Sequence, residues 1–143
     1  MQWLPAMKPA LSLVESVERL RRGLDYHMSR HNVLVSNLTQ SETPGYRPLD
    51  LARSDFKKVL GVALETTNAG HLGGQSPAAN ATTAGFRVIK GGPAEAGGDG
   101  NSVDVDKEAM KIASNQLRYD TLAQLTQNEL SDLVWAANDG RTG

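Results

Sequence analysis

His27 and His31 come closest, among the residues of this chain, to a known chemical arrangement. They stand four positions apart, so on a helix they share one face and together could hold a metal ion. Metalloproteases place a glutamate directly after the first histidine, whereas this chain has Met28 there. The third histidine, His71, lies far along the chain, and the chain has no cysteine to supply a thiolate. We therefore predict no metal site and expect both histidines to pack at a helix interface. The alternative is a helical interaction protein that uses a His27/His31 metal site.

The acidic segment 99–106, Asp-Gly-Asn-Ser-Val-Asp-Val-Asp, is similar to a calcium-binding loop only at first sight. In the register of an EF-hand, Val103 occupies a ligand position, Asp104 replaces the required glycine, and Met110 replaces the bidentate glutamate. Neither Gly73-Gly74 nor Gly91-Gly92 opens a helix with a following Lys-Ser or Lys-Thr, so these glycines form no phosphate loop. Ser, His and Asp all occur in the chain, but no serine stands in the motif of a nucleophile elbow. The sequence therefore predicts no enzyme, no cofactor and no small-molecule substrate.

The composition bounds the fold and the class of partner. A chain of 143 residues is long enough for one domain, but only 5% of its residues are aromatic. Ten of the 14 glycines lie between Gly61 and Gly100, where they disfavour long regular elements. The formal net charge of −1 gives no basic excess for binding nucleic acid or an anionic membrane. We therefore expect the core to come from the two ends of the chain, helped by neighbouring copies.

Both ends of the chain carry the alternating three-and-four spacing of a coiled-coil seam. The first ladder consists of Ala10, Leu13, Val17, Leu20, Leu24, His27, His31, Leu34 and Leu38. The second, on a helix from about Asp106 to Ala137, consists of Ala109, Ile112, Gln116, Tyr119, Ala123, Thr126, Leu130 and Leu133. Asp104 or Asp106 is expected to cap this second helix, with Glu108 in its first turn. The pattern predicts a mainly α fold in which the two long helices pair as an antiparallel coiled-coil hairpin.

Between the two long helices, the sequence predicts shorter secondary-structure elements. We expect an extended connector after Pro48, a short helix over 54–60 capped by Ser54, and a strand over 86–89. The rest of the glycine-rich insert is expected to be irregular or partly disordered. The predicted organisation is a flexible N-terminus (1–9), an N-terminal helix with its stop (10–46), a connector with the insert (47–100), a C-terminal helix (101–138) and a tail (139–143).

The first helical pattern ends abruptly at a Thr-Pro-Gly-Tyr turn. Its proline lacks an amide hydrogen and disfavours the α conformation for the preceding threonine, and its glycine can take the positive φ of a reversal. With the asparagine upstream, this turn resembles the Asn-Ile-Ala-Asn-x-x-Thr-Pro-Gly-Tyr signature of flagellar rod and hook proteins, the axial subunits of the bacterial flagellum. The matching residues are Asn37, Thr43, Pro44, Gly45 and Tyr46. Leucine replaces the isoleucine, and Thr-Gln replaces the Ala-Asn.

A second segment narrows the resemblance. The acidic segment 99–106 is similar to the Asp-Gly-Asn-x-Val-Asp-x-Asp stretch that precedes the last helix of B-type flagellar rod proteins. The matching residues are Asp99, Gly100, Asn101, Val103, Asp104 and Asp106. Residues 115–119 resemble the family's Asn-x-Leu-x-Tyr, and residues 47–51 loosely resemble its Arg-x-Leu-Asp. The nearer alternative is a C-type rod subunit, which shares the Thr-Pro-Gly-Tyr turn.

The resemblance implies a structural subunit of the hollow shaft that carries torque from the motor ring to the hook and filament. Such a subunit leaves the cytoplasm unfolded through the flagellar type III exporter and joins the rod that spans the periplasm. The start Met-Gln-Trp-Leu-Pro has no basic region of a cleavable signal peptide, in agreement with this route.

The implied partners are further copies of the chain, other rod proteins, the inner-membrane ring protein, the adaptor and the export gate. The expected assembly interface is the apolar part of both ladders, because one thin hairpin cannot cover it. Its residues are Leu13, Val17, Leu20, Leu24, Leu34, Leu38, Ile112, Tyr119, Leu130 and Leu133.

Overall fold

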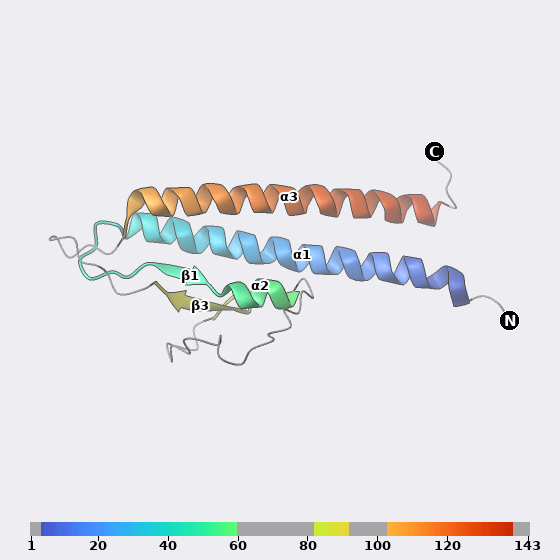
Figure 1. Ribbon diagram of the computed structural model, residues 1–143, viewed down its shortest axis with the longest axis horizontal. Helices are drawn as coiled ribbons and strands as arrows, with labels where there is room; N and C mark the ends of the chain where they lie inside the picture. Colours follow the sequence, from blue (N-terminus) through green and yellow to red (C-terminus); the bar gives the residue numbers. More distant parts are fainter. Residues whose placement is uncertain (1–3, 60–81, 92–102, 139–143) are drawn as a thin grey trace, which may run out of the picture.

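The computed structural model describes residues 4–59, 82–91 and 103–138, with side chains over 13–59, 83–91 and 103–138. The elements follow the chain in the order α1 (Leu4–Thr39), β1 (Leu49–Leu51), α2 (Arg53–Val59), β2 (Thr82–Thr83), β3 (Phe86–Lys90) and α3 (Val105–Ala137). The parts of the glycine-rich insert over 60–81 and 92–102, including His71, lie outside the described residues. Figure 1 shows the two long helices side by side, with the smaller elements against α1.

The helices α1 and α3 form the antiparallel hairpin that the sequence predicts. The C-terminal end of α1 lies beside the N-terminal end of α3, and their opposite ends lie together at the far end of the molecule (Figure 1). Helix α1 begins at Leu4, ahead of the predicted start at Ala10. Pro5 fits this first turn because no helical amide bond is needed there. Within the described ranges, neither helix contains a stretch long and apolar enough to cross a membrane.

Helix α1 is covered on two faces. The described members of its predicted ladder, from Leu13 to Leu38, are all buried or half-buried. A second ladder with the same spacing is covered as well, and it consists of Gly23, Tyr26, Arg30, Val33 and Asn37. Hydropathy alone hides this second face because two of its five members are polar. Helix α1 therefore lies between α3 on one side and the sheet with α2 on the other (Figure 1).

The covered face of α3 differs from the predicted ladder at alternate positions. Ile112, Tyr119, Thr126 and Leu133 are half-buried as expected. Between them, the more buried position lies one residue earlier than predicted. Glu108 and Asn115 are 2% and 1% exposed, whereas Ala109 and Gln116 are exposed. The packed face thus consists of Glu108, Ile112, Asn115, Tyr119, Leu122, Thr126, Glu129 and Leu133.

The small sheet has the strand order β1-β3-β2, and both pairs are antiparallel. The strands β2 and β3 are joined through Ala84 and Gly85, whose φ values of 52° and 83° are those of a two-residue hairpin turn. Phe86 and Val88 face inward, as the strand prediction for 86–89 requires. Tyr26, Leu51 and Phe86 form the buried core cluster between sheet and helix, and Val33, Phe56, Val59 and Val88 pack around it.

Helix α2 is present as predicted, but its expected cap is wrong. Ser54 lies in the first turn, and the backbone carbonyl of Ala52 accepts from Asp55 N at 3.1 Å. The Ser54 hydroxyl oxygen instead accepts from Arg87 Nη2 at 2.7 Å. Asp55 accepts from the backbone nitrogen of Arg87 at 2.8 Å, so the start of α2 is joined to β3.

Candidate functional site at the helix junction

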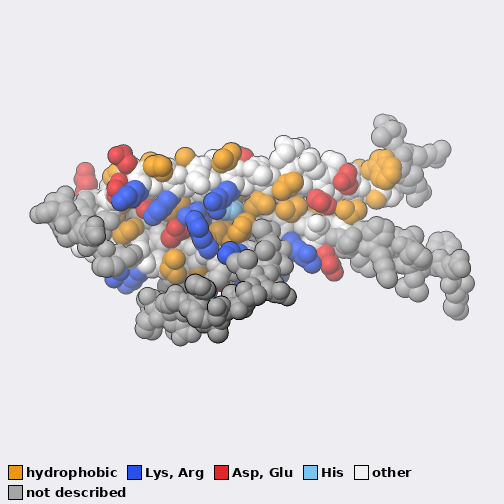
Figure 2. Space-filling view, viewed as in Figure 1, with side chains coloured by type: hydrophobic (Ala, Val, Ile, Leu, Met, Phe, Trp, Pro, Cys, Tyr) orange, Lys and Arg blue, Asp and Glu red, His pale blue; other side chains and the backbone are white. Residues whose placement is uncertain are grey.

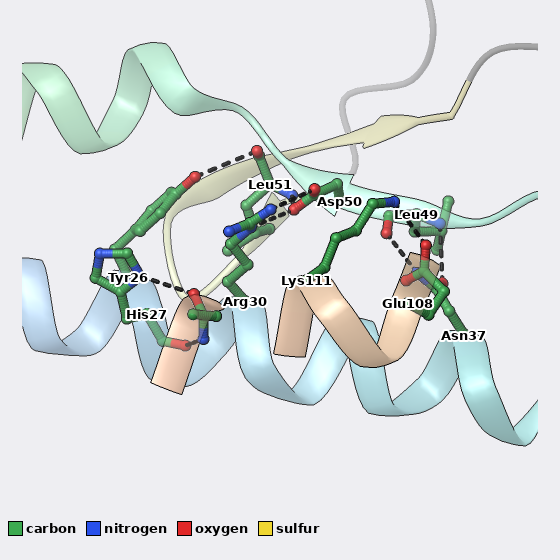
Figure 3. A network of polar contacts seen from close by, with 10 residues as sticks. Tyr26, His27, Arg30, Asn37, Leu49, Asp50, Leu51, Glu108 and Lys111 are labelled. Atoms are coloured by element: carbon green, nitrogen blue, oxygen red, sulfur yellow. Dashed lines mark hydrogen bonds and ion pairs between the residues drawn. The ribbon is translucent and has the colours of Figure 1, made fainter. Parts of the chain in front are cut away.

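Asn37, the first residue of the flagellar signature, is the centre of a buried hydrogen-bond network (Figure 3). It is 0% exposed and uses both donors and both lone pairs of its amide. Its Nδ2 donates to Leu49 O at 2.7 Å and to Glu108 Oε2 at 2.8 Å. Its Oδ1 accepts from Leu49 N at 2.9 Å and from Tyr46 Oη at 3.0 Å. One side chain on α1 therefore joins the helix-stop turn, β1 and α3.

Glu108 also belongs to this network. The sequence suggests only that it lies in the first turn of the second helix. Its side chain is 3% exposed, and its Oε1 accepts from Lys111 Nζ at 2.6 Å. The carboxylate is thus paired with a cation on its own helix and with Asn37 on the other helix. A buried carboxylate without such partners would destabilise the fold, so this pairing fixes how α3 lies on α1.

The turn that precedes β1 has the conformation that its sequence predicts. Helix α1 ends at Thr39, and Thr43 N and Tyr46 N donate to the carbonyls of Gln40 and Thr43 at 3.0 and 3.2 Å. Gly45 has a φ of +75°, a conformation that a side chain would strain. Thr43, Pro44 and Gly45 are exposed, while Tyr46 is half-buried and reaches Asn37. The turn therefore returns the chain along α1 and positions Tyr46 and Leu49.

A second tie between α1 and β1 is the ion pair of Arg30 and Asp50. Arg30 Nε and Nη2 donate to the two carboxylate oxygens at 2.7 and 2.8 Å, and Leu51 N donates to Asp50 Oδ1 at 2.7 Å. Burial raises the pKa of Asp50, but the hydrogen bonds and charge of Arg30 outweigh this effect, and the pKa lies below its ordinary value. Asp50 falls in the segment 47–51 that loosely matches the family pattern, and the structure gives it this role.

His27 and Asn115 make the third tie, between α1 and α3. Asn115 Nδ2 donates to the backbone carbonyl of His27 at 2.7 Å, and His27 Nδ1 lies 2.7 Å from Asn115 Oδ1. Both residues are 1% exposed. Burial lowers the pKa of His27, and the positive charges of Arg30 and Arg118 lower it further, against the raising effect of Asn115. The imidazole is therefore neutral near pH 7, as the expected packing role requires.

This lowered pKa predicts that mild acid weakens the fold. The unfolded chain binds a proton at His27 near pH 6.5, whereas the folded chain binds it only at lower pH. The contribution of His27 to the free energy of unfolding is therefore fully present above about pH 6.5. It falls as the pH decreases, by at most about 1.4 kcal/mol per pH unit. Asp50 adds a loss only in stronger acid because its pKa is lowered. Urea denaturation at pH 7.5, 6.5 and 5.5 measures the slope, and His27→Gln should flatten it. An unchanged slope in that variant would contradict the assignment to His27.

The second signature segment is partly described. Asp99, Gly100 and Asn101 lie outside the described residues. Val103 is 7% exposed, and Asp104 is the N-cap of α3, with its Oδ1 accepting from Lys107 N at 3.1 Å. Asp106 is exposed in the first turn, where a carboxylate stabilises the helix dipole. Of the two expected caps, Asp104 is the one used.

The residues expected at the assembly interface have different surroundings within one chain. Leu34 is 0% exposed, so it belongs to the core of the hairpin. Leu130 is 47% exposed and remains available to a neighbour. The other eight are half-buried, and these are Leu13, Val17, Leu20, Leu24, Leu38, Ile112, Tyr119 and Leu133. Sequence reasoning did not find the roles of Arg30, Glu108 and Asn115, although their spacing along the helices is that of packed positions.

The polar groups of the junction hold the helices and β1 together. The charged groups of the junction are paired with one another, and within 4–59, 82–91 and 103–138 no cluster of three or more His, Asp or Glu side chains could hold a metal ion. The exposed surface of the hairpin also carries large apolar side chains. Met110, Leu117 and Trp135 on α3 are 72%, 69% and 57% exposed. Buried polar groups that satisfy one another and two long paired helices define a structural protein built as a helical hairpin.

Comparison with curated proteins identifies the family. The chain is 34% identical over 109 residues to the flagellar basal body rod protein FlgB of Salmonella typhimurium, covering 69% of this chain and 75% of that protein. It is 31% identical over 129 residues to FlgB of Yersinia enterocolitica, with 84% and 91% covered. FlgB of Cereibacter sphaeroides is 34% identical over 113 residues, with 76% and 82% covered. No family model matches the chain. The chain belongs to the FlgB family of flagellar basal body rod proteins.

Proposed function

We propose that the chain polymerises through its two long helices to build the proximal part of the flagellar rod. In this role it is a drive-shaft subunit that joins the inner-membrane ring and export gate to the distal rod and hook, and motility requires it. The FlgB relatives, named as basal body rod proteins, support the place of assembly. The apolar outer face of α3 is the structural observation that carries the proposal.

This outer face lies opposite the contact with α1. Leu117 and Trp135 are 18 residues apart, which is five full turns of an α-helix, and Met110 lies seven residues before Leu117. The three side chains therefore lie on one stripe, and each is more than half exposed. Figure 2 shows apolar side chains along both helices on one face of the molecule. Gln124 and Asn128 lie on the same side of the helix between Leu117 and Trp135. The three exposed apolar side chains are nevertheless unfavourable in water and favour packing against another helix.

Helix α1 presents a second outer stripe with a seven-residue repeat. Val14, Met28 and Val35 are 52%, 54% and 39% exposed. Arg21 occupies the remaining position of this repeat, and its guanidinium is paired with Glu18 at 2.8 Å and with Asp25 at 3.1 Å. Because neighbours on the same helix neutralise its charge, Arg21 is compatible with a helix interface. Two outer stripes allow each hairpin to contact neighbours on both helices, as a closed shaft requires.

The remaining parts of the proposal follow from the family. The subunit crosses the inner membrane through the flagellar type III exporter without cleavage of a signal, and it resides in the rod within the periplasm. Its partners are other copies, other rod proteins, the inner-membrane ring protein, the adaptor and the export gate. The junction around Asn37 would then form after export, when the two ends of the chain meet.

Purified hook–basal bodies test this function directly. Mass spectrometry before and after the filament and hook are stripped should find the chain in both preparations, because the rod stays with the rings. A strain that lacks the chain should make no filaments and should not swim, and the intact gene should restore both. Absence of the chain from well-populated basal bodies would overturn the rod assignment.

A further inference from the structure

A small cavity lies between α1 and α3 beside the His27–Asn115 contact. Its volume is about 150 Å³, and it is lined by His27, Met28, His31, Asn115, Gln116 and Tyr119. This volume is larger than one water molecule needs and is suited to an ion or a very small ligand. Three of the lining side chains, all from α1, carry atoms that bind metals: two imidazoles and a thioether.

The hydrogen bonds of Asn115 determine which nitrogen of His27 is available. Because Asn115 Nδ2 donates to the His27 carbonyl, its Oδ1 is the acceptor that faces His27 Nδ1 at 2.7 Å. Nδ1 must then carry the hydrogen, and Nε2 has a bare lone pair. This Nε2 is buried and has no hydrogen-bond partner among the described residues. An imidazole whose other nitrogen is fixed by an amide oxygen is the usual arrangement of a metal-bound histidine.

His31 supplies a second nitrogen of the same kind. Its Nδ1 is also buried without a hydrogen-bond partner in the described part of the chain. The spacing of four places His31 one turn after His27, and Met28 is three residues before His31, so the three side chains lie within one arc of the helix. Unpartnered buried polar atoms are costly and call for an explanation. An ion held by both nitrogens would remove this cost.

The donors and charges around the cavity favour a soft, singly charged ion. All three donors are neutral, and in the described part of the chain no carboxylate lines the cavity to balance a doubly charged ion. The positive charges of Arg30 and Arg118 act on His27 and would oppose a second charge more than a first. The thioether donor favours copper(I), because zinc binds imidazole, thiolate and carboxylate in preference to a thioether, and harder ions favour oxygen donors. We propose that His27, Met28 and His31 form a copper(I) site on the α1 face of the hairpin.

Copper binding by this site does not depend on rod assembly, because all three donors come from one chain. Purified full-length protein is mixed without oxygen with copper(I) held by the coloured chelator bicinchoninate. The protein should withdraw one equivalent of copper and bleach the chelator complex. His31→Ala and Met28→Leu should each weaken binding about tenfold or more. Met110→Leu, which removes an exposed thioether on the outer face of α3, should leave it unchanged.

Two further measurements separate a built site from loose adsorption. X-ray absorption at the copper edge should show two nitrogen ligands and one sulfur ligand, and excess zinc(II) should not displace the copper. Far-ultraviolet circular dichroism checks that each variant keeps its helices. Met28→Leu retains the volume and hydrophobicity of an exposed side chain, so the test remains valid if His31→Ala fails to fold. Failure to withdraw copper, binding indifferent to His31 and Met28, or displacement by zinc would overturn the proposal.

Discussion

Replacing Asn37 with alanine is expected to lower the free energy of unfolding by about 3 kcal/mol or more. The amide makes four hydrogen bonds in a fully buried position, and its loss strands both backbone groups of Leu49 and the hydroxyl of Tyr46. It also leaves the buried carboxylate of Glu108 with Lys111 alone. Domains of this size are stable by only about 5–15 kcal/mol. The urea midpoint of the purified variant, followed by circular dichroism, measures the loss.

Asn32 provides a matched control for this substitution. It is the same residue type on the same helix, but it is exposed, so Asn32→Ala should change stability by no more than about 0.5 kcal/mol. Asn37→Asp keeps the size of the side chain but places a second carboxylate against Glu108. At pH 7 it should destabilise the hairpin about as much as the alanine variant. Wild-type stability in Asn37→Asp would show that size, and not hydrogen bonding, is what the position requires.

The parts of the fold that could be predicted from sequence are those set by local patterns. The helix stop follows from Pro44 and Gly45, and the N-cap of α3 was limited to Asp104 or Asp106, because these residues act on the backbone next to them. The first ladder of α1 keeps its spacing without a slip and is apolar except at its two histidines, so one of the two covered faces of this helix was predicted correctly. The strand at Phe86–Lys90 is short, but its flanking glycines limit where it can begin and end.

The register of α3 shows where hydropathy is insufficient. The predicted and the observed ladder share every second member and differ by one residue at the four others. Between Ile112 and Tyr119 the choice is Asn115 or Gln116. Neither choice is apolar, so the pattern cannot decide. The structure selects Asn115 because its amide can bond both the backbone and the ring of His27 across the interface. A buried polar position is determined by its partner, and the partner is 88 residues away.

Asn37 and Tyr46 were selected because they match the signature of flagellar rod and hook proteins, and the match gives no physical reason for either residue. Their role becomes clear only when β1 returns along α1 and brings Leu49 to the same amide. Arg30 is a similar case, since an arginine on a helix is usually solvated and this one is 6% exposed. It is covered because Asp50 lies opposite, a contact over 20 residues that no local pattern reveals. The available signal was a set of polar residues at the three-and-four spacing of a covered helix face. A search for apolar residues alone does not find them.

Replacing Leu117 with glutamate should abolish rod assembly while leaving the monomer folded. Leu117 is 69% exposed on the outer stripe of α3, so within one chain the new carboxylate stays in water, and the free energy of unfolding should change by less than about 0.5 kcal/mol. In the proposed polymer the same position is covered by a neighbouring helix. Burying an unpaired carboxylate there costs several kcal/mol at every subunit contact. Swimming of a deletion strain that carries the variant gene measures the outcome, together with the rod content of its basal bodies.

A control must show that the position of the new charge, rather than the charge itself, causes the loss of assembly. Gln127→Glu adds the same charge to an exposed residue of α3 that lies about 80° around the helix from Leu117, and it should support normal swimming. Leu117→Met keeps an apolar side chain of similar volume and should also swim. If Leu117→Glu assembles normally, the outer stripe of α3 faces solvent or the channel in the rod. The contacts between subunits would then have to lie on the Val14, Met28 and Val35 stripe of α1.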